Sequence, residues 1–134
     1  MGRKFEMVTE FLFRGKALEE LKGLKIREFA RFLKSRARRN LLRQFDSIEK
    51  FLVRIDKKHK RGKQIRTHSR SLVIVPAMVS LTINVHNGKE FIPVKILPEM
   101  LGHRLGEFVP TRQKVAHSAP GIGATKSSAA LSVK

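Results

Sequence analysis

The side chains of this chain that could do chemistry are mostly cations. Lysine and arginine number 29 against 11 aspartates and glutamates, so the formal net charge is +18 on 134 residues. No acid occurs from Lys57 to Lys89, and none follows Phe108. A chain this basic repels itself unless an anion neutralises it, and nucleic acid is the polyanion whose phosphates lysine and arginine bind. The composition therefore predicts a nucleic-acid partner that is contacted at the two acid-free segments.

Patterns typical of catalytic and metal sites are missing from the sequence. There is no cysteine, which excludes disulfides, thiolate catalysis and cysteine-based zinc sites. The acids are dispersed, and Ser69 and Ser71 lack a Gly-x-Ser-x-Gly elbow, so no hydrolytic site is indicated. We predict no enzymatic activity, no cofactor and no bound metal, because the histidines lack metal-ligand spacing. These histidines are His59, His68, His86, His103 and His117.

One segment near the C-terminus has glycines followed by Lys126 and Ser127, faintly like a phosphate-binding loop. The glycine that such a loop needs before its lysine is missing, and no strand precedes the segment. Residues 118–134 are mostly small and cannot bury enough apolar surface to offset the entropy of ordering. We predict a flexible basic tail there, in which small residues around Lys126 allow close approach to phosphates.

Residues 1–45 are predicted to form a basic helical extension. Ile26, Phe29, Ala30 and Leu33 follow the i, i+3, i+4, i+7 spacing of an amphipathic helix. Three arginines follow with no acid between them, and like charges this close are costly unless an anion joins them. RNA contact is therefore favoured over a solvated helix face. The arginines are Arg36, Arg38 and Arg39.

The next helix is predicted to start at Asp46, with Glu49 three residues later completing a capping box. Its buried stripe is Ile48, Phe51, Leu52 and Ile55. Gly62 ends the helix, and cations near a helix C-terminus favour the macrodipole, which accounts for two or three of the charges there. The excess is predicted to bind RNA. The basic residues of this segment are Lys57, Lys58, Lys60, Arg61 and Lys63.

Beyond this helix the apolar period changes from 3.6 to 2. Residues 72–75 form a β-branched run that stops at Pro76, and residues 81–86 alternate apolar with polar side chains. A further apolar run occupies residues 91–96. Pro98 at a first helical position and Gly102 after the end predict one turn of helix.

Asn87-Gly88 lies between the two strand-like runs and predicts a hairpin with a type I′ turn. That turn would place Ile83 opposite Ile92 and Leu81 opposite Val94. Proline cannot donate to a strand ladder, so the strand containing Pro93 is predicted to be an edge.

The fold class is predicted to be α+β, with basic N-terminal helices, a small mixed or antiparallel three-stranded sheet and an extended C-terminal tail. We divide the chain into an extension over 1–45, an RNA-binding core over 46–117 and a tail over 118–134. Aromatic residues are 7%, all phenylalanine, and the signatures of RRM and KH modules are absent. Phosphate and sugar contacts and shape should therefore supply the affinity, with little base stacking. We expect a cytoplasmic protein with no membrane partner, because no apolar run approaches about 20 residues.

Several segments together resemble ribosomal protein S19 of the small subunit. They are IRTHSR at 65–70, IVPAMV at 74–79, TINVHNGK at 82–89, FIPV at 91–94 and MLGHRLGEFVPTR at 100–112. The resemblance covers about residues 46–117. The long basic start and APGIGAT at 119–125 resemble the archaeal and eukaryotic branch of that family.

The resemblance implies a structural constituent of the small ribosomal subunit, bound to the 3′ (head) domain of its ribosomal RNA. It implies ribosomal protein S13 as a neighbour, and a C-terminal tail that reaches toward the decoding site and tRNA. It implies that RNA faces Arg66, His68, Ser69, Arg70, Lys89, His103, Arg104, Thr111 and Arg112. The candidate set also contains Lys114 and Lys126.

Other interpretations stay open at this point. A free-standing nucleic-acid chaperone or compacting protein explains the charge equally well, but it leaves the hairpin and the Gly-His-x-Leu-Gly-Glu-Phe block unexplained. An enzyme has no residue constellation to support it. Gly102 and Gly106 serve either backbone geometry or close approach to RNA. Glu107 is expected to pair with a nearby arginine.

Overall fold

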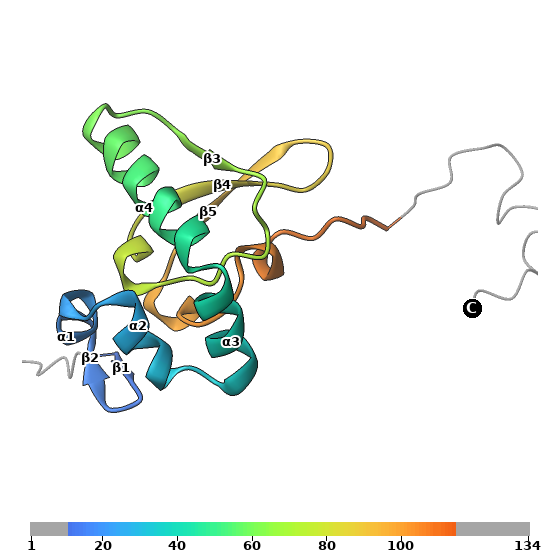
Figure 1. Cartoon of the computed structure of the whole chain (residues 1–134). Coiled ribbons are helices and arrows are strands. Elements are labelled where there is room, and N and C mark those ends of the chain that lie inside the picture. The colour runs from blue at the N-terminus through green and yellow to red at the C-terminus, as the bar shows by residue number, and fades with distance from the viewer. Residues whose placement is uncertain (1–10, 115–134) are drawn as a thin grey trace, which may run out of the picture.

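The computed structural model describes residues 11–114, and these form an α+β fold that confirms the predicted class (Figure 1). Most helices lie in the first half of the described chain, and the larger sheet lies in the second half. The predicted tail over 118–134, including Lys126, lies outside the described residues. The helices are α1 (Leu18–Gly23), α2 (Ile26–Phe29), α3 (Ser35–Arg43) and α4 (Phe45–Lys60). The strands are β1 (Leu12–Phe13), β2 (Lys16–Ala17), β3 (Ile65–Thr67), β4 (Thr82–His86) and β5 (Phe91–Lys95).

The larger sheet has the order β3-β4-β5, with β3 parallel to β4 and β4 antiparallel to β5. It is therefore a mixed three-stranded sheet, one of the two forms that the prediction allowed. Pro93 lies in the edge strand β5, opposite Asn84, so its missing N–H disrupts no ladder toward the interior.

The predicted hairpin register is wrong by two residues. Ile83 lies opposite Val94, and His86 opposite Phe91, so residues 87–90 form the loop. The side chain of Asn87 explains the longer loop, because its Oδ1 accepts hydrogen bonds from the backbone N–H of Lys89 (2.8 Å) and of Glu90 (2.7 Å). This local side-chain turn replaces the two-residue turn. An even shift keeps every side chain on its predicted face.

The third strand is β3, and residues 72–75 do not join the sheet. All four residues of that run are buried, with a single bridge between Val73 and Arg104. Their backbone groups bond instead to a distant turn: the Ile74 N–H donates to the carbonyl of His103 (2.8 Å), and the Leu105 N–H to that of Leu72 (3.1 Å). The run is a buried connection, which is why it is apolar at every position.

The longest helix, α4, starts one residue before the predicted Asp46 cap. Gln44 precedes it without a side-chain capping hydrogen bond, and this single residue separates α3 from α4. Gln44 and Asn40 donate instead to Ser71, at its Oγ (3.3 Å) and its carbonyl oxygen (3.2 Å). Gly62, with φ of 62°, follows the helix end as expected.

The N-terminal part is helical but more broken than predicted. The helix expected over 26–33 is a single α turn, α2, followed by a 3₁₀ turn over Ala30–Phe32. The β1–β2 hairpin was not predicted at all. Arg14 and Gly15, with φ of 50° and 78°, form its two-residue turn, and strands of two residues are too short to show alternation in the sequence.

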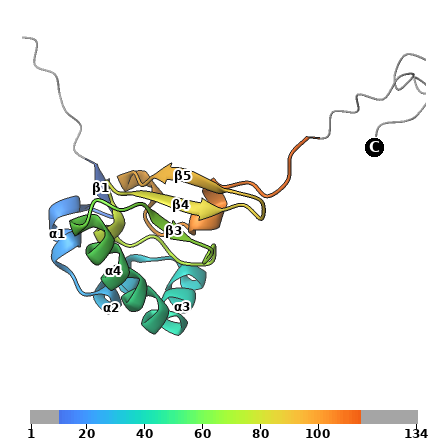
Figure 2. The same ribbon diagram turned by 90° about the horizontal axis from the view of Figure 1, so that it is seen from above.

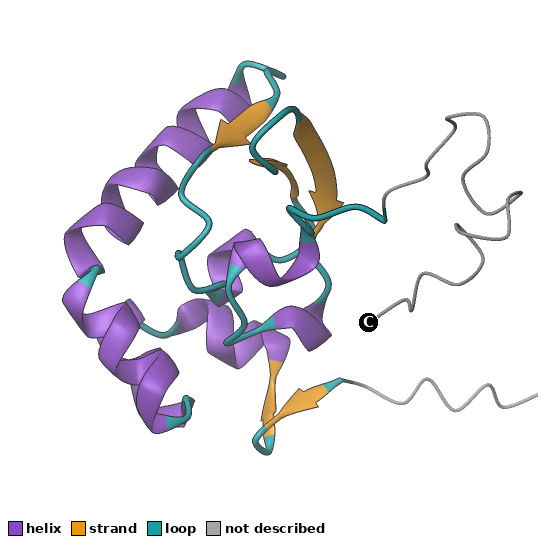
Figure 3. Cartoon of the chain, turned by 90° about the vertical axis from the view of Figure 1, so that its right-hand side faces the viewer, coloured by secondary structure: helices purple, strands orange, loops and turns teal. Residues whose placement is uncertain are grey.

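One buried cluster joins all parts of the described chain. Leu21, Phe29 and Leu41 from the N-terminal part belong to the same cluster as Ile48 of α4 and Ile83 of β4. Figure 2 shows the sheet as one layer with the helices beneath it, and Figure 3 shows the same separation from the side. The far face of the sheet carries no helix among residues 11–114. None of the helices in this part of the chain is long and apolar enough to cross a bilayer.

Candidate nucleic-acid interface

The basic side chains have few acidic partners. Within residues 11–114 the ion pairs are Lys16–Glu20, at 3.5 Å, and His103–Glu107, at 2.7 Å. No arginine takes part in either pair. An excess of cations without carboxylate partners is what a phosphate-binding surface requires.

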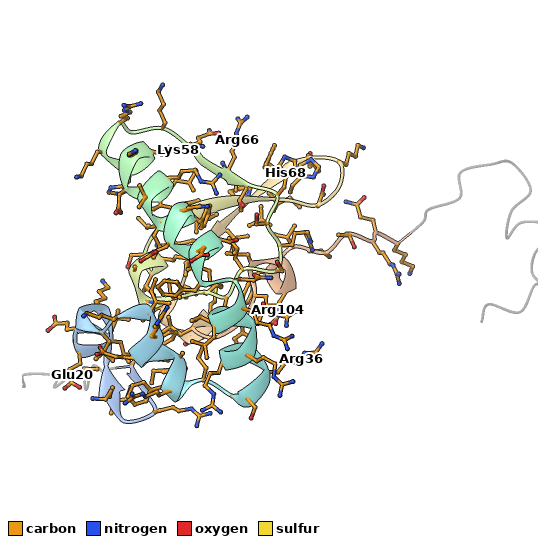
Figure 4. All side chains as sticks on the ribbon, in the orientation of Figure 1. Glu20, Arg36, Lys58, Arg66, His68 and Arg104 are labelled. Carbon is orange, nitrogen blue, oxygen red and sulfur yellow. The ribbon has the colours of Figure 1, made fainter. Side chains whose placement is uncertain are left out.

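The first basic surface lies where α3 meets the turn over 102–107. Lys34, Arg36 and Arg104 line a groove of about 430 Å³ together with Gly102 and Glu107. Figure 4 shows Arg36 and Arg104 on this side of the molecule. The fold therefore brings together two predicted RNA-binding arginines that are far apart in the sequence. We call this the α3 groove.

Further arginines of α3 extend the basic surface that begins at the α3 groove. Arg38, Arg39 and Arg43 line a shallow hollow beside the exposed Leu42. Residues three and four apart share a helix face, so these arginines form a continuous stripe. Arg38 and Arg39 line this hollow, whereas Arg36, the third arginine that the sequence grouped with them, lines the α3 groove.

A second basic surface lies at the C-terminal end of α4. All the predicted residues there are exposed except Lys58, which is half-buried. Lys63 and His59 line a hollow that continues onto the sheet at Asn84 and Pro93. Figure 4 shows Lys58 at the end of the molecule opposite Arg36, so this surface is separate from the α3 groove. The residues of this surface are Lys57, Lys58, Lys60, Arg61 and Lys63.

Arg70 is engaged within the protein. Its guanidinium donates hydrogen bonds to the backbone carbonyls of His86 (2.7 Å), Gly106 (2.9 Å) and Val109. The side chain is half-buried. One planar fork of donors thus ties together the end of β4 and the segment over 106–109. We call this arrangement the Arg70 clamp.

The two glycines of the block MLGHRLGEF at 100–108 both have structural roles. Gly102 has φ of 81°, and a Cβ there would lie 2.8 Å from Leu33 Cδ2. A Cβ at Gly106 would lie 3.0 Å from both Cβ and the carbonyl oxygen of Arg70. Backbone geometry explains Gly102, and close packing against the clamp explains Gly106.

Glu107 pairs with a histidine, so the prediction of an arginine partner is wrong. Its Oε2 lies 2.7 Å from His103 Nδ1. The two residues are four apart along the turn, which puts them side by side, whereas Arg36 and Arg104 only line the same groove. The exposed His103 ring also lies edge-on to Phe108, with centroids 6.0 Å apart.

A third group lies on the uncovered face of the sheet. Arg66 and His68 are both exposed there, and Figure 4 shows them beside the β4–β5 hairpin. The exposed Lys89 belongs to the loop of that hairpin. Ser69 follows, with its backbone N–H donating to Thr67 Oγ1 (3.0 Å).

Sequence reasoning missed two residues of this group, His86 and Phe91. Their rings pack against His68, with centroids 4.4 and 5.0 Å from its ring. The predicted hairpin register was wrong and did not place Phe91 opposite His86, so the two rings were not recognised as neighbours. A longer hairpin loop shifts the register by an even number of residues. Considering that alternative would have placed the two rings opposite each other.

The last predicted residues within the described range follow the compact part of the chain. Thr111, Arg112 and Lys114 are exposed and lie in no helix or strand, and this segment leads away from the body in Figure 1. No cluster of three or more histidine, aspartate or glutamate side chains within 11–114 is arranged to hold a metal ion.

A model of a known protein family matches this chain. The family model described as "Ribosomal protein S19" matches residues 34–117. The matched span is more than half of the 134 residues, and it includes α3, α4, the three-stranded sheet and the Arg70 clamp.

Proposed function

Because the chain belongs to the ribosomal protein S19 family, we propose that it binds and fixes the 3′ (head) domain of small-subunit ribosomal RNA. The family is one of structural, rRNA-binding proteins of the small ribosomal subunit that act in translation. Such proteins are generally not enzymes. The finer proposal concerns the RNA domain that is bound and the surfaces of this chain that bind it.

The observation that carries the proposal is the set of unpaired cations. The arginines of α3, Arg104 and the basic end of α4 have no carboxylate partner within residues 11–114. Separate surfaces at opposite ends of the body suit a folded RNA that surrounds the protein on several sides. Each phosphate neutralised releases condensed counterions, and this release supplies the affinity, while the shape of the folded body supplies the fit.

The C-terminal tail is proposed to reach toward the decoding site and tRNA. Its composition supports this, since residues 109–134 contain no acid and include Lys126. The exposed Arg112 and Lys114 would begin this path at the edge of the described body. Ribosomal protein S13 is proposed as the neighbouring protein in the head, and the archaeal and eukaryotic type is proposed from the long basic start.

The salt dependence of binding tests this proposal. If the chain contacts about eight phosphates of the head-domain RNA, log affinity should fall against log salt with a slope of about −6 to −7. Titration of the purified chain against that RNA between low and high potassium chloride measures the slope. A slope near −1 would contradict the proposal.

Sedimentation separates this function from that of a free nucleic-acid chaperone. A ribosomal protein should travel with the small subunit when a cell extract is spun at low salt. A chaperone or compacting protein should stay mostly in the light fractions, although its charge is the same.

A further inference from the structure

The uncovered face of the sheet carries histidine and phenylalanine rings that contact one another. Along β4 the buried Ile83 and Val85 alternate with Thr82, Asn84 and His86, which point to the other face. The registers of β3 and β5 add further side chains to that face. They are Arg66 on β3, His68 just after it, and Phe91, Pro93 and Lys95 on β5.

Three rings form a triangular cluster at one end of this face: His68 from just after β3, His86 from β4 and Phe91 from β5. The centroids of His68 and His86 are 4.4 Å apart, those of His86 and Phe91 4.8 Å, and those of His68 and Phe91 5.0 Å. The Arg66 guanidinium carbon lies 5.4 Å from the centre of the Phe91 ring. Every pair is within the range of direct ring or cation–π contact.

Both exposed members of this group, Arg66 and His68, make contacts within the protein. Arg66 donates from Nε (3.3 Å) and Nη2 (3.0 Å) to one oxygen, Oε1 of Gln64. His68 packs on the half-buried His86 and Phe91. Exposed arginine and histidine side chains normally rotate freely, and fixing them lowers the entropy that a ligand must remove.

His86 is oriented by a backbone donor. The Gly88 N–H donates to His86 Nδ1 at 3.0 Å, so the proton of a neutral His86 ring lies on Nε2. The hairpin loop thereby orients a ring that packs against His68.

We propose that Arg66 and His68 form a stacking site for one unpaired base of ribosomal RNA, with His86 and Phe91 as its support. The inference rests on the proposed function, and it adds a base contact to a protein otherwise expected to bind phosphates. A flat guanidinium and an imidazole on an exposed face are the groups on which splayed-out RNA bases stack. Lys89 in the hairpin loop and Lys95 on this face of β5 supply charge for the flanking phosphates, and the acids nearest to them in the sequence are Glu90 and Glu99 respectively.

A base explains this group better than phosphate alone. Phosphate binding needs charge but no ring, and α3 shows that this chain builds a cationic surface from arginines without any ring contact between them. A site of packed rings beneath an ordered guanidinium offers flat surface, which phosphate does not use.

Two substitutions test the site while leaving the number of lysine and arginine charges unchanged. His68→Ala removes a ring, and Arg66→Lys keeps the charge but loses the planar group. Each should weaken binding of the full chain to the head-domain RNA about fivefold or more, with the salt slope unchanged. Lys89→Ala should instead reduce the steepness of that slope by about 0.7–0.9.

A matched control exists on the other side of the molecule. The Arg27 guanidinium carbon lies 4.8 Å from the ring centre of Phe45, a pair similar to Arg66 and Phe91. Arg27→Lys should leave the RNA affinity within twofold of the wild type. An equal loss in Arg27→Lys and Arg66→Lys would overturn the site.

A second measurement reports stacking directly. A short single-stranded RNA that carries 2-aminopurine should lose fluorescence on binding the wild-type chain, and less on binding His68→Ala. If both substituted chains keep the wild-type affinity for RNA and the wild-type quenching of 2-aminopurine, the rings serve only to pack the end of the sheet. Weaker association with ribosomal protein S13 at unchanged RNA affinity would assign the face to a protein instead.

The outcome also separates this inference from the proposed function. If the wild-type chain binds head-domain RNA with the steep salt slope but both substitutions bind equally well, only the stacking site fails. If the wild-type chain shows no preference for that RNA, the proposed function fails, and the 2-aminopurine measurement alone decides the stacking site.

Discussion

At the scale of single residues, Arg70 shows how a cation can be used for folding in a chain full of cations. Its guanidinium satisfies three carbonyl groups from two separate segments. The sequence could place Arg70 only in a basic run beside Arg66 and His68, because nothing local distinguishes an arginine that bonds carbonyls 16 to 39 residues away. Such contacts depend on tertiary structure alone.

Arg70→Lys should destabilise the chain while keeping its charge. A lysine cannot reproduce the planar fork, and leaving part-buried carbonyls without donors costs about 1–3 kcal/mol. Urea unfolding of the full chain measures this loss. Arg39→Lys, at an exposed position, should change the free energy of unfolding by less than about 0.5 kcal/mol. Equal stability of the two variants would refute the clamp.

At the scale of elements, the hairpin illustrates a partial success. Asn87-Gly88 correctly predicted a turn between two antiparallel strands, and Pro93 correctly predicted the edge. The loop is longer than predicted because the side chain of Asn87 accepts hydrogen bonds from backbone N–H groups of the loop itself. A dipeptide signal cannot choose between these two local solutions.

Asn87→Ala should loosen this loop. It removes the acceptor of two backbone N–H groups, and loss of such a side-chain turn costs about 0.5–2 kcal/mol, as at a helix cap. Hydrogen exchange at the amides of Lys89 and Glu90 should accelerate. Asn87→Asp retains an acceptor oxygen and should keep most of the protection. The same exchange rates in Ala and Asp variants would argue against this role.

The buried stripes were the most predictable elements. Ile48, Phe51 and Ile55 of α4 are buried as their spacing required, and only Leu52 is half-buried. The strand β3 could not be predicted, because three residues in one buried-exposed-buried cycle carry too little pattern. The apolar run over 72–75 carried the stronger pattern but gave its hydrogen bonds to the 102–105 turn.

At the scale of the whole molecule, residues 11–45 share the core of the later described segments. Leu21 and Phe29 are at most 1% exposed, and Leu33 lies against Gly102, so the N-terminal helices cover apolar surface of the later segments. Sequence reasoning described 1–45 as a basic helical extension. Composition reports the outer surface and not the packing beneath it.

Removing residues 1–33 should destabilise the remaining chain severely. Each large apolar side chain that is buried contributes about 1.5–3 kcal/mol, and the loss of several approaches the total of about 5–15 kcal/mol for a domain. Urea unfolding followed by circular dichroism measures it. In the full chain Leu12→Ala, at a side chain 59% exposed, should have little effect. A truncated chain that unfolds at the wild-type urea concentration would contradict the shared core.

The Arg70 clamp has a consequence for the order of events during synthesis. Arg70 and Val109 are 39 residues apart, so at about 5–20 residues per second the acceptor is made about 2–8 s after the donor. The backbone hydrogen bonds of the buried run over 72–75 likewise cannot form until the 102–105 turn has been made. During that interval the nascent chain already exposes its basic helices but cannot close its body. The body of this chain can therefore reach its final packing only after Val109 has been made.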